Sequence, residues 1–402
     1  MSGILRLPAR VHFGYGARAQ IPALLSAHGT RVFALVDPFL IGTELLDEVL
    51  TAAQSADLTV EVCADVQPEL PVASLDEVAA RARAFAPDAI LAIGGGSALD
   101  AAKLVALLLA HGGPLSRFYG ENAVPGAITP VVAAPTTAGT GSEVTPIAVV
   151  TDPDRALKVG VSSPHLVPVA AVVDPTFTLD APANVTAFSG IDALVHAVES
   201  YTAAAREANW TDTLPVFIGR NVLTDPLSLA AIEKLGTWLP TAVADPSDRR
   251  AREEVALGSL LAGIAFGSTG THLSHALQYP IGAETGTPHG LGTGLMLPYV
   301  LDAVRADPAV TERLAVVGSA LGSPADDIAS RANDAIAAVA RINRQIGVPT
   351  SLADIGITRD QLPRIAELAL ASERLVTISP APVTMAMLGE LLERAWAGDL
   401  RT

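Results

Sequence analysis

Cysteine and positive charge are both scarce in this chain of 402 residues. The single cysteine, Cys63, excludes a disulfide framework and a zinc site built from cysteines, and it fits a reducing, cytoplasmic location. Lysine and arginine together number 26 against 42 aspartates and glutamates, which gives a formal net charge of −16. Because nucleic acids and anionic membranes bind clustered basic charge, neither is expected as the main partner.

Long hydrophobic runs are also missing, although 50% of the residues are hydrophobic and the mean hydropathy is +0.40. The most apolar stretch, residues 91–110, is interrupted by Asp100 and Lys103. A membrane-spanning helix needs about 20 consecutive apolar residues, so none is expected. The first 16 residues lack the layout of a signal peptide. This composition excludes global disorder, and the length suits two domains.

Short apolar runs alternate with helical patterns over the first 180 residues. The runs read as strands at residues 31–36, 58–63, 88–93 and 130–134, and the helical patterns span residues 75–86 and 97–110. Continuous apolar strands separated by helices are typical of a parallel sheet that is covered on both faces. We therefore expect an α/β domain over residues 1–181.

The pattern becomes helical after about residue 180, where a proline-containing stretch (175–184) suggests a boundary. Helices are predicted at residues 187–205, 226–238, 251–268, 271–279, 290–304, 309–321, 326–346, 359–371 and 383–396. We expect an all-α domain over residues 182–402. Residues 205–225 form a long connection, and connections of this length are often functional or inserted.

A glycine-rich turn, Gly94-Gly95-Gly96-Ser97, follows a predicted strand and opens a helix. Glycines at this place let a phosphate approach the backbone N–H groups at the positive end of the helix. Ser97 could cap the helix, and Lys103, one of three lysines in the chain, lies two turns further on. The pattern is not the usual GxGxxG fingerprint, so a plain strand-to-helix turn is the alternative.

A second polar motif, PTTAGTGSEVT at residues 135–145, also follows a predicted strand. Its hydroxyls and glycines could form a ledge for ribose or phosphate, and a generic loop is the alternative. Asp37 ends the first apolar strand, where a carboxylate can accept hydrogen bonds from ribose hydroxyls and repel a 2′-phosphate. An ordinary turn aspartate before Pro38 is the alternative there.

Several histidines are spaced so that they could bind a metal. Asp192 and His196 lie four residues apart and therefore share one face of a predicted helix. His275 lies in a second helical segment, and His289 precedes a third. One carboxylate and three imidazoles can hold iron, zinc, nickel or manganese. Each part of this metal-site prediction has an alternative. His272 could be the ligand in place of His275. Asp192 and His196 could form an ordinary pair on the surface of a helix, and His289 could be a structural turn residue.

The motifs GGGSALDAAK, PTTAGTGSEVT, GIDALVHAVESY and PHGL occur in this order. Together they resemble the iron-containing (group III) alcohol dehydrogenases over nearly the whole chain, from FGYG to MLPYV at residues 296–300. The resemblance implies a dehydroquinate synthase-like architecture with NAD and a divalent metal, Fe²⁺ first and Zn²⁺ or another ion second, in a cleft between the domains. It also leads us to expect a homo-oligomer, namely a dimer, acting on a small-molecule substrate.

Site residues carry over from the family by position. The implied metal ligands are Asp192, His196, His275 and His289. The 14-position spacing between the last two ligands in the family is kept from His275 to His289, which favours His275 over His272. The implied cofactor residues are Asp37, Gly94, Gly95, Gly96, Ser97, Asp100, Thr136, Thr137, Ser142, Thr145 and Lys158. Asp37 matches the position associated with NAD rather than NADP.

One position departs from the family pattern. Many members carry a second histidine four residues after the third ligand, whereas this chain has Tyr279 there. Tyr279 and the loop 205–225 resemble the hydroxyacid-oxoacid transhydrogenase branch, although that branch's insertion before PHG is missing. The alcohol proton is expected to leave through water, a ribose hydroxyl or Tyr279, which is the candidate catalytic residue. Arg220 is a candidate partner for a substrate carboxylate, with an exposed salt bridge as the alternative.

The predicted activity is metal-dependent hydride transfer between NAD and a small alcohol/aldehyde or hydroxy acid/oxo acid pair. One alternative is a hydroxyacid-oxoacid transhydrogenase that retains its NAD. Another is a lyase of the dehydroquinate synthase type, which three lysines disfavour because its phosphorylated substrate needs more cations. A third is a non-enzymatic sensor of metal or nucleotide.

Overall fold

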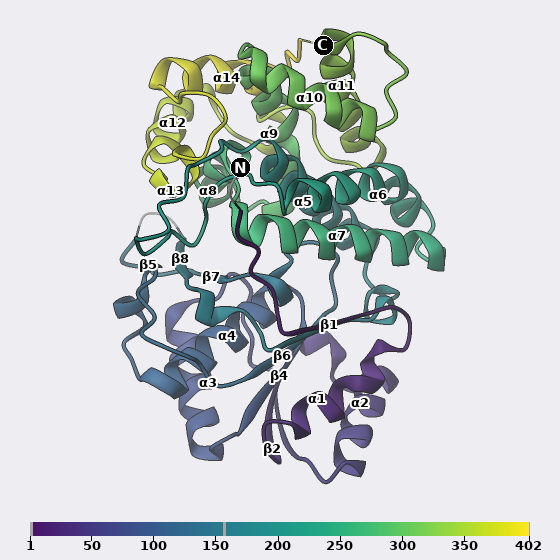
Figure 1. Ribbon diagram of the computed structural model, residues 1–402, viewed down its shortest axis with the longest axis vertical. Coiled ribbons are helices and arrows are strands. Elements are labelled where there is room, and N and C mark those ends of the chain that lie inside the picture. The colour runs from purple at the N-terminus through teal and green to yellow at the C-terminus, as the bar shows by residue number, and fades with distance from the viewer. Residues whose placement is uncertain (1–2, 156–157, 402) are drawn as a thin grey trace. The chain divides into compact units, whose positions relative to one another are not determined.

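The computed structural model describes residues 3–155 and 158–401 (Figure 1). Contacts within the chain divide it into two compact units. The first unit spans Arg6–Asp180, and the second begins at Ala181 and also includes residues 3–5. The side chain of Asn221 donates to the carbonyl of Ile4 at 3.4 Å, so Ile4 packs with the second unit.

The first unit contains a six-stranded sheet with the strand order β1-β9-β6-β4-β2-β3. Its strands are β1 (Arg10–Phe13), β2 (Arg31–Val36), β3 (Thr59–Cys63), β4 (Ala89–Gly94), β6 (Val131–Pro135) and β9 (Ala170–Val173). Every pair in this sheet is parallel. The predicted α/β fold with a parallel sheet is therefore confirmed, and the four predicted strands correspond to β2, β3, β4 and β6.

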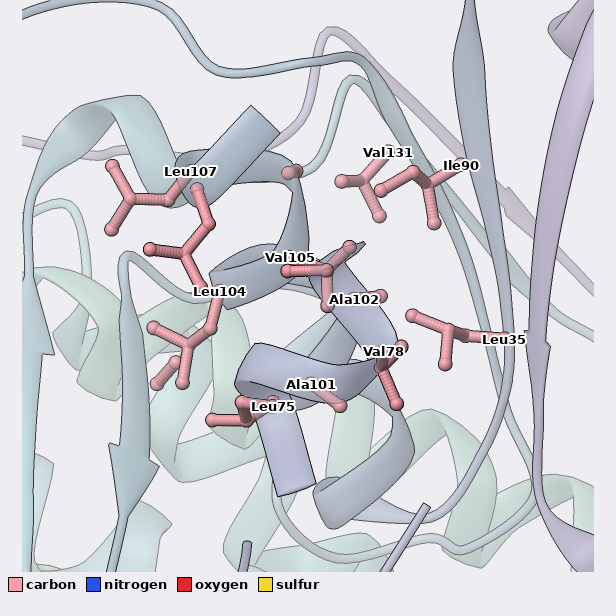
Figure 2. Packing of buried hydrophobic residues seen from close by; sticks show 14 of the residues in the cluster. Leu35, Leu75, Val78, Ile90, Ala101, Ala102, Leu104, Val105, Leu107 and Val131 are labelled. Carbon is pink, nitrogen blue, oxygen red and sulfur yellow. The ribbon is translucent and has the colours of Figure 1, made fainter. Parts of the chain in front are cut away.

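Helices cover both faces of this sheet, with α1 (Ile21–Ser26) and α2 (Glu44–Ser55) on one face and α3 (Val72–Phe85) and α4 (Gly96–His111) on the other (Figure 1). Strand residues alternate between two buried clusters: Leu35 packs with α3 and α4, whereas Val36 packs with α1 and α2. Figure 2 shows Leu35 of β2 near Val78 of α3. Burial on both faces explains why these strands are continuously apolar.

Several short elements of both units are missed by the sequence analysis. A three-stranded sheet has the order β5-β8-β7 and consists of β5 (Gly120–Glu121), β7 (Ile147–Val150) and β8 (Val159–Ser162). The 3₁₀ helices of the chain are η1 (Ala17–Gln20), η2 (Pro38–Leu40), η3 (Leu115–Phe118), η4 (Ser142–Val144), η5 (Pro164–Leu166), η6 (Pro175–Thr178), η7 (Ala353–Ile355) and η8 (Arg359–Gln361). Elements of two to four residues are too short to show a period in the sequence.

The second unit is helical, as predicted, and its described residues contain no named strand. Its helices are α5 (Ala183–Thr202), α6 (Asp225–Ala244), α7 (Arg249–Thr269), α8 (Leu273–Thr285), α9 (His289–Val304), α10 (Pro308–Ala320), α11 (Ile328–Gln345), α12 (Leu362–Leu370), α13 (Glu373–Val376) and α14 (Met385–Ala397). Residues 203–224 join α5 to α6. Across the described residues, none of the helices combines the length and the apolar character that crossing a membrane requires.

Glycines at the start of α9 allow this helix to approach α5 and α8 closely. A Cβ atom at Gly290 would overlap the carbonyl oxygen of Phe188 in α5, and one at Gly292 would overlap the side chain of Gln278 in α8. The motif PHGLG therefore brings the first residue of α9, His289, against both neighbouring helices.

Candidate metal centre and cofactor turn

Four side chains from three helices converge in the second unit. Asp192 and His196 lie one turn apart on α5, His275 lies on α8, and His289 begins α9. The Nε2 atoms of His196, His275 and His289 are 3.7, 3.8 and 3.7 Å from a carboxylate oxygen of Asp192. Ligand atoms of Asp192, His196 and His275 all lie within 4.8 Å of one another. The structure thus brings together the four residues that the sequence analysis gives as metal ligands.

Asp192 is buried and held as an anion. The Thr293 hydroxyl donates to its Oδ1 at 2.8 Å. Burial alone would raise the pKa of Asp192, but the three imidazoles and this hydroxyl outweigh burial, so the pKa lies below its usual value. Phe266 stacks on the ring of His196 with centroids 4.2 Å apart, which gives the cluster an apolar wall.

The imidazole of His275 is prepared to bind a cation. Burial and the neighbouring His196 lower the pKa of His275 well below 6.5, so the ring is neutral near pH 7. Its Nδ1 lies 2.8 Å from Oε2 of Glu199, and because a carboxylate only accepts, Nδ1 donates. Its Nε2 is buried and has no hydrogen-bond partner among the described residues. An unsatisfied nitrogen beside a carboxylate and two further imidazoles fits a divalent metal.

His272, the alternative to His275, has another partner. It is completely buried, and its Nε2 lies 2.9 Å from the hydroxyl of Thr202. Its Nδ1 lies 3.3 Å from Oε1 of Glu199, whereas Nε2 of His275 lies 3.8 Å from Oδ1 of Asp192, so the geometry favours His275 as the ligand. Tyr279 follows His275 by one turn, and its ring stacks against that of His289, with centroids 6.1 Å apart and planes inclined at 28°.

The two glycine-rich motifs of the first unit face each other at the carboxyl ends of β4 and β6. Gly94 is in register with Pro135, and its carbonyl accepts from the Thr136 amide at 2.9 Å. The N-cap of α4 is Gly95, with Ser97 inside the first turn, so the expected capping role of Ser97 is wrong. With no side chain at the N-cap, the backbone N–H groups of this turn stay accessible to a ligand.

Gly95 and Thr136 point to a ligand at this turn. A Cβ atom at Gly95 would meet only Thr137, at an ordinary distance of 3.5 Å, whereas one at Gly96 would lie 2.6 Å from Thr140. A glycine is thus needed at position 96 so that α4 can pack against Thr140, whereas the absent side chain of Gly95 leaves space that a ligand could occupy. The hydroxyl oxygen of Thr136 is buried without a hydrogen-bond partner in the described part of the chain. Asp37 lies beside the turn, because a Cβ atom at Gly94 would lie 3.1 Å from that of Asp37.

The remaining expected cofactor residues hold the second motif in place. Asp100 accepts from the Ser142 hydroxyl at 2.5 Å and from the Val149 amide at 2.9 Å. Lys103 is completely buried and donates to the carbonyl and the hydroxyl of Thr145, at 2.9 and 3.3 Å. The ammonium group of Lys103 is therefore engaged inside the protein.

Other charged residues have contacts that the sequence does not reveal. Lys158 forms an ion pair with Glu69. Arg220, the expected carboxylate partner, lies among Tyr201, Asp225 and Arg313. The sequence analysis misses two residues that act on His275, namely Glu199 and Arg374. Glu199 could be found from its spacing, because it follows His196 by three residues on the same helix face. The sequence gives no signal for Arg374.

Comparisons with known proteins identify the family. The model of iron-containing alcohol dehydrogenases matches residues 8–175, and that of the C-terminal domain of the Fe-containing alcohol dehydrogenase family matches residues 186–396. The chain belongs to the iron-containing alcohol dehydrogenase family. It is therefore an enzyme, an NAD-linked and metal-dependent oxidoreductase. The lyase and sensor alternatives are not supported.

Similar proteins cover nearly the full chain. Long-chain-alcohol dehydrogenase 1 of Geobacillus thermodenitrificans is 34% identical over 98% of this chain and 96% of its own length. The NAD-dependent methanol dehydrogenase of Bacillus methanolicus is 33% identical over 96% of this chain and 98% of its own length. The mitochondrial hydroxyacid-oxoacid transhydrogenase of Caenorhabditis briggsae is 30% identical over 96% of this chain and 88% of its own length. A crystal structure of 1,3-propanediol oxidoreductase aligns with a TM-score of 0.91 and 28% identity, over 98% of this chain and 100% of that one.

Proposed function

We propose that Asp192, His196, His275 and His289 hold the divalent metal of this oxidoreductase, with Fe²⁺ as the first candidate. The observation that carries this proposal is the buried, unsatisfied Nε2 of His275 among two imidazoles and an ionised carboxylate. When bound, such an ion polarises a substrate oxygen and lowers the pKa of an alcohol. The protein supplies a neutral imidazole at His275 and an ionised carboxylate at Asp192, and Phe266 keeps water from His196.

We propose that the turn at Gly95 and the hydroxyl of Thr136 bind NAD, together with the residues that match the family motif around them. Asp37 lies beside this turn, where its carboxylate would accept from the ribose hydroxyls and repel a 2′-phosphate. We expect NAD to be used at least tenfold more efficiently than NADP. Equal kcat/KM values for the two cofactors would contradict the role of Asp37.

We propose that Tyr279 relays the proton that leaves the alcohol: its phenolic oxygen accepts this proton while its own O–H proton passes to water. Its ring is half-buried and stacks against that of His289, so the hydroxyl is carried on a fixed ring close to the metal cluster. Tyr279→Phe keeps the ring and removes only the hydroxyl. Turnover should fall tenfold or more with unchanged NAD affinity, whereas an unchanged rate would make Tyr279 a packing residue.

A second candidate function is hydride transfer between hydroxy acids and oxo acids, and Arg374 favours it. Its guanidinium group lies 4.9 Å from the centroid of the Phe217 ring and forms no ion pair with the described residues. The pKa of His275 is lowered mainly by burial and by His196, and the positive charge of Arg374 lowers it further. Arg374 therefore lies within electrostatic reach of the proposed metal ligands. A planar cation that has no acidic partner in the described part of the chain suits a substrate carboxylate.

Two four-carbon aldehydes test this selectivity, because butanal and succinic semialdehyde differ in one terminal carboxylate. In Arg374→Gln, kcat/KM for succinic semialdehyde should fall tenfold or more while that for butanal stays within twofold. Arg220→Gln is the matched control and should leave both values unchanged. Equal losses for the two aldehydes in Arg374→Gln would contradict an anion-binding role.

The oligomeric state is proposed from the family resemblance, and the cellular location from the single cysteine. We propose a homodimer, in line with the resemblance, and light scattering should give about twice the chain mass of 41.2 kDa. We propose a cytoplasmic location because Cys63 is a buried, unpaired thiol. Fractionation of the source cells tests this placement, and recovery outside the cytoplasm would contradict it.

A further inference from the structure

Glu199 is an acid buried completely in the helical unit, and no lysine or arginine forms an ion pair with it among the described residues. A buried carboxylate is costly unless hydrogen bonds compensate for the lost water. Two backbone amides supply such bonds: the amide of His272 donates to Oε2 at 2.8 Å, and that of Ser274 donates to Oε1 at 2.6 Å. Both amides belong to the start of α8, where the helix dipole also favours a negative charge.

The third strong contact of Glu199 reaches a proposed metal ligand. Its Oε2 accepts from Nδ1 of His275 at 2.8 Å. A proton fixed on Nδ1 leaves the lone pair of a neutral imidazole on Nε2, the atom that lies 3.8 Å from Oδ1 of Asp192. Glu199 therefore determines both the tautomer and the orientation of the His275 ring.

The spacing on α5 explains how one helix organises this arrangement. Asp192, His196 and Glu199 stand at positions i, i+4 and i+7, so all three lie on one face of α5. The first two belong to the proposed metal site directly. The third holds the start of α8, and with it His275, against that face.

We propose that Glu199 is a positioning residue of the metal centre, which fixes the tautomer and the ring of His275 and thereby sets the affinity for the metal. This inference rests on the metal site proposed above, and neither the family match nor the relatives assign such a role. Glu199 hydrogen-bonds to a ligand and does not itself belong to the four-residue set. A carboxylate behind a metal-bound imidazole also raises the basicity of the ring, and loss of such a partner typically weakens metal binding by about 10–100-fold.

Glu199→Gln tests the proposal because it keeps the size of the side chain while removing its charge. A glutamine has one acceptor oxygen, so it cannot satisfy the three N–H groups that now converge on Glu199. In the full-length enzyme we expect the dissociation constant for Zn²⁺, measured by chelator competition, to rise tenfold or more. In the Co²⁺-loaded enzyme the visible absorption bands should shift, because the geometry around the ion changes.

Ser200→Ala is the matched control. Ser200 is the next residue of α5 and is completely buried, and its hydroxyl oxygen accepts hydrogen bonds from the hydroxyls of Ser228 and Thr269. Its loss removes a buried polar contact of the same helix without touching a ligand. We expect an unchanged Zn²⁺ dissociation constant and unchanged Co²⁺ bands, whatever the effect on the unfolding midpoint.

The outcomes separate this inference from the proposed metal site. If Glu199→Gln folds and binds Zn²⁺ within twofold of the unmodified enzyme, the positioning role is refuted while the site stands. If His275→Ala also keeps its affinity, the metal site itself is refuted. Should Glu199→Gln fail to fold, Glu199→Asp takes its place: the shorter acid keeps the charge but cannot reach all three donors. Its Zn²⁺ affinity should fall severalfold, and an unchanged affinity would overturn the proposal.

Discussion

Gly95 shows at the scale of one residue how a ligand-binding glycine differs from a packing glycine. Its φ is −73°, which any residue adopts, and a Cβ atom there would touch only Thr137 at 3.5 Å. An added methyl group is therefore compatible with the fold but would occupy the space at the N-terminus of α4. Gly96 differs, because a Cβ atom there would lie 2.6 Å from Thr140.

Gly95→Ala should raise the dissociation constant for NADH tenfold or more while the unfolding midpoint changes little. The physical reason is that the methyl group keeps the pyrophosphate away from the backbone N–H groups. Binding is followed by NADH fluorescence, with thermal unfolding as the measure of stability. Gly96→Ala should instead lower the midpoint. If Gly95→Ala binds NADH normally, the cofactor does not approach this turn.

The metal-site residues differ in how far the sequence could predict them. Asp192 and His196 are apparent because their i, i+4 spacing suffices to place them on one face. The choice between His272 and His275 depends on long-range partners, Thr202 and Glu199 of α5, which no local pattern contains. Arg374 is missed for the same reason, because its approach to Phe217 joins segments more than 150 positions apart.

At the scale of elements, the predictable strands are those buried on both faces. β2, β4 and β6 are continuous apolar runs, and the predicted bounds of each strand lie within about one residue of the observed bounds. β1 is partly exposed and reads RVHF, so it has neither a continuous run nor a clear alternation. β9 is buried but has only four residues, which is too short for its pattern to stand out from the surrounding chain.

A buried acid in the 3₁₀ helix η4 lies within electrostatic reach of Lys103 of α4. Glu143 in η4 is buried, and its burial raises the pKa to about 7, an effect that Lys103 of α4 only partly offsets. A folded-state pKa above the unfolded value means that the folded protein retains a proton that the unfolded chain has lost. The corresponding stability is present below the unfolded value of about 4.5 and is lost as the pH rises through 7.

Glu143→Gln should therefore reduce the dependence of stability on pH. From pH 5.5 to 7.5 the free energy of unfolding of the unmodified protein should decrease relative to that of the variant by on the order of 1 kcal/mol. Urea denaturation at the two pH values provides the comparison. Lys103 has a pKa of about 8, lowered by burial, and so it stays largely charged in this window. Parallel changes in the two proteins would contradict the pKa assigned to Glu143.

At the scale of the whole molecule, the two kinds of chemistry lie in different units. The proposed NAD residues, from Asp37 to Lys158, all belong to the first unit, and the proposed metal ligands, from Asp192 to His289, all belong to the second. This separation follows the order of the motifs along the chain, which is why the architecture could be predicted together with the family. It also implies that loss of the metal should leave NAD binding in place.

The metal content and NAD-linked turnover of His275→Ala, compared with those of His272→Asn, test the proposed metal centre most directly. We predict that His275→Ala is purified with little metal and no measurable alcohol oxidation but still binds NADH, because only one ligand of the second unit has been removed. His272→Asn should keep its metal, because the ring nitrogens of His272 lie beside Thr202 and Glu199 and not beside Asp192. A His275→Ala protein with full metal content and full turnover would contradict the proposed centre.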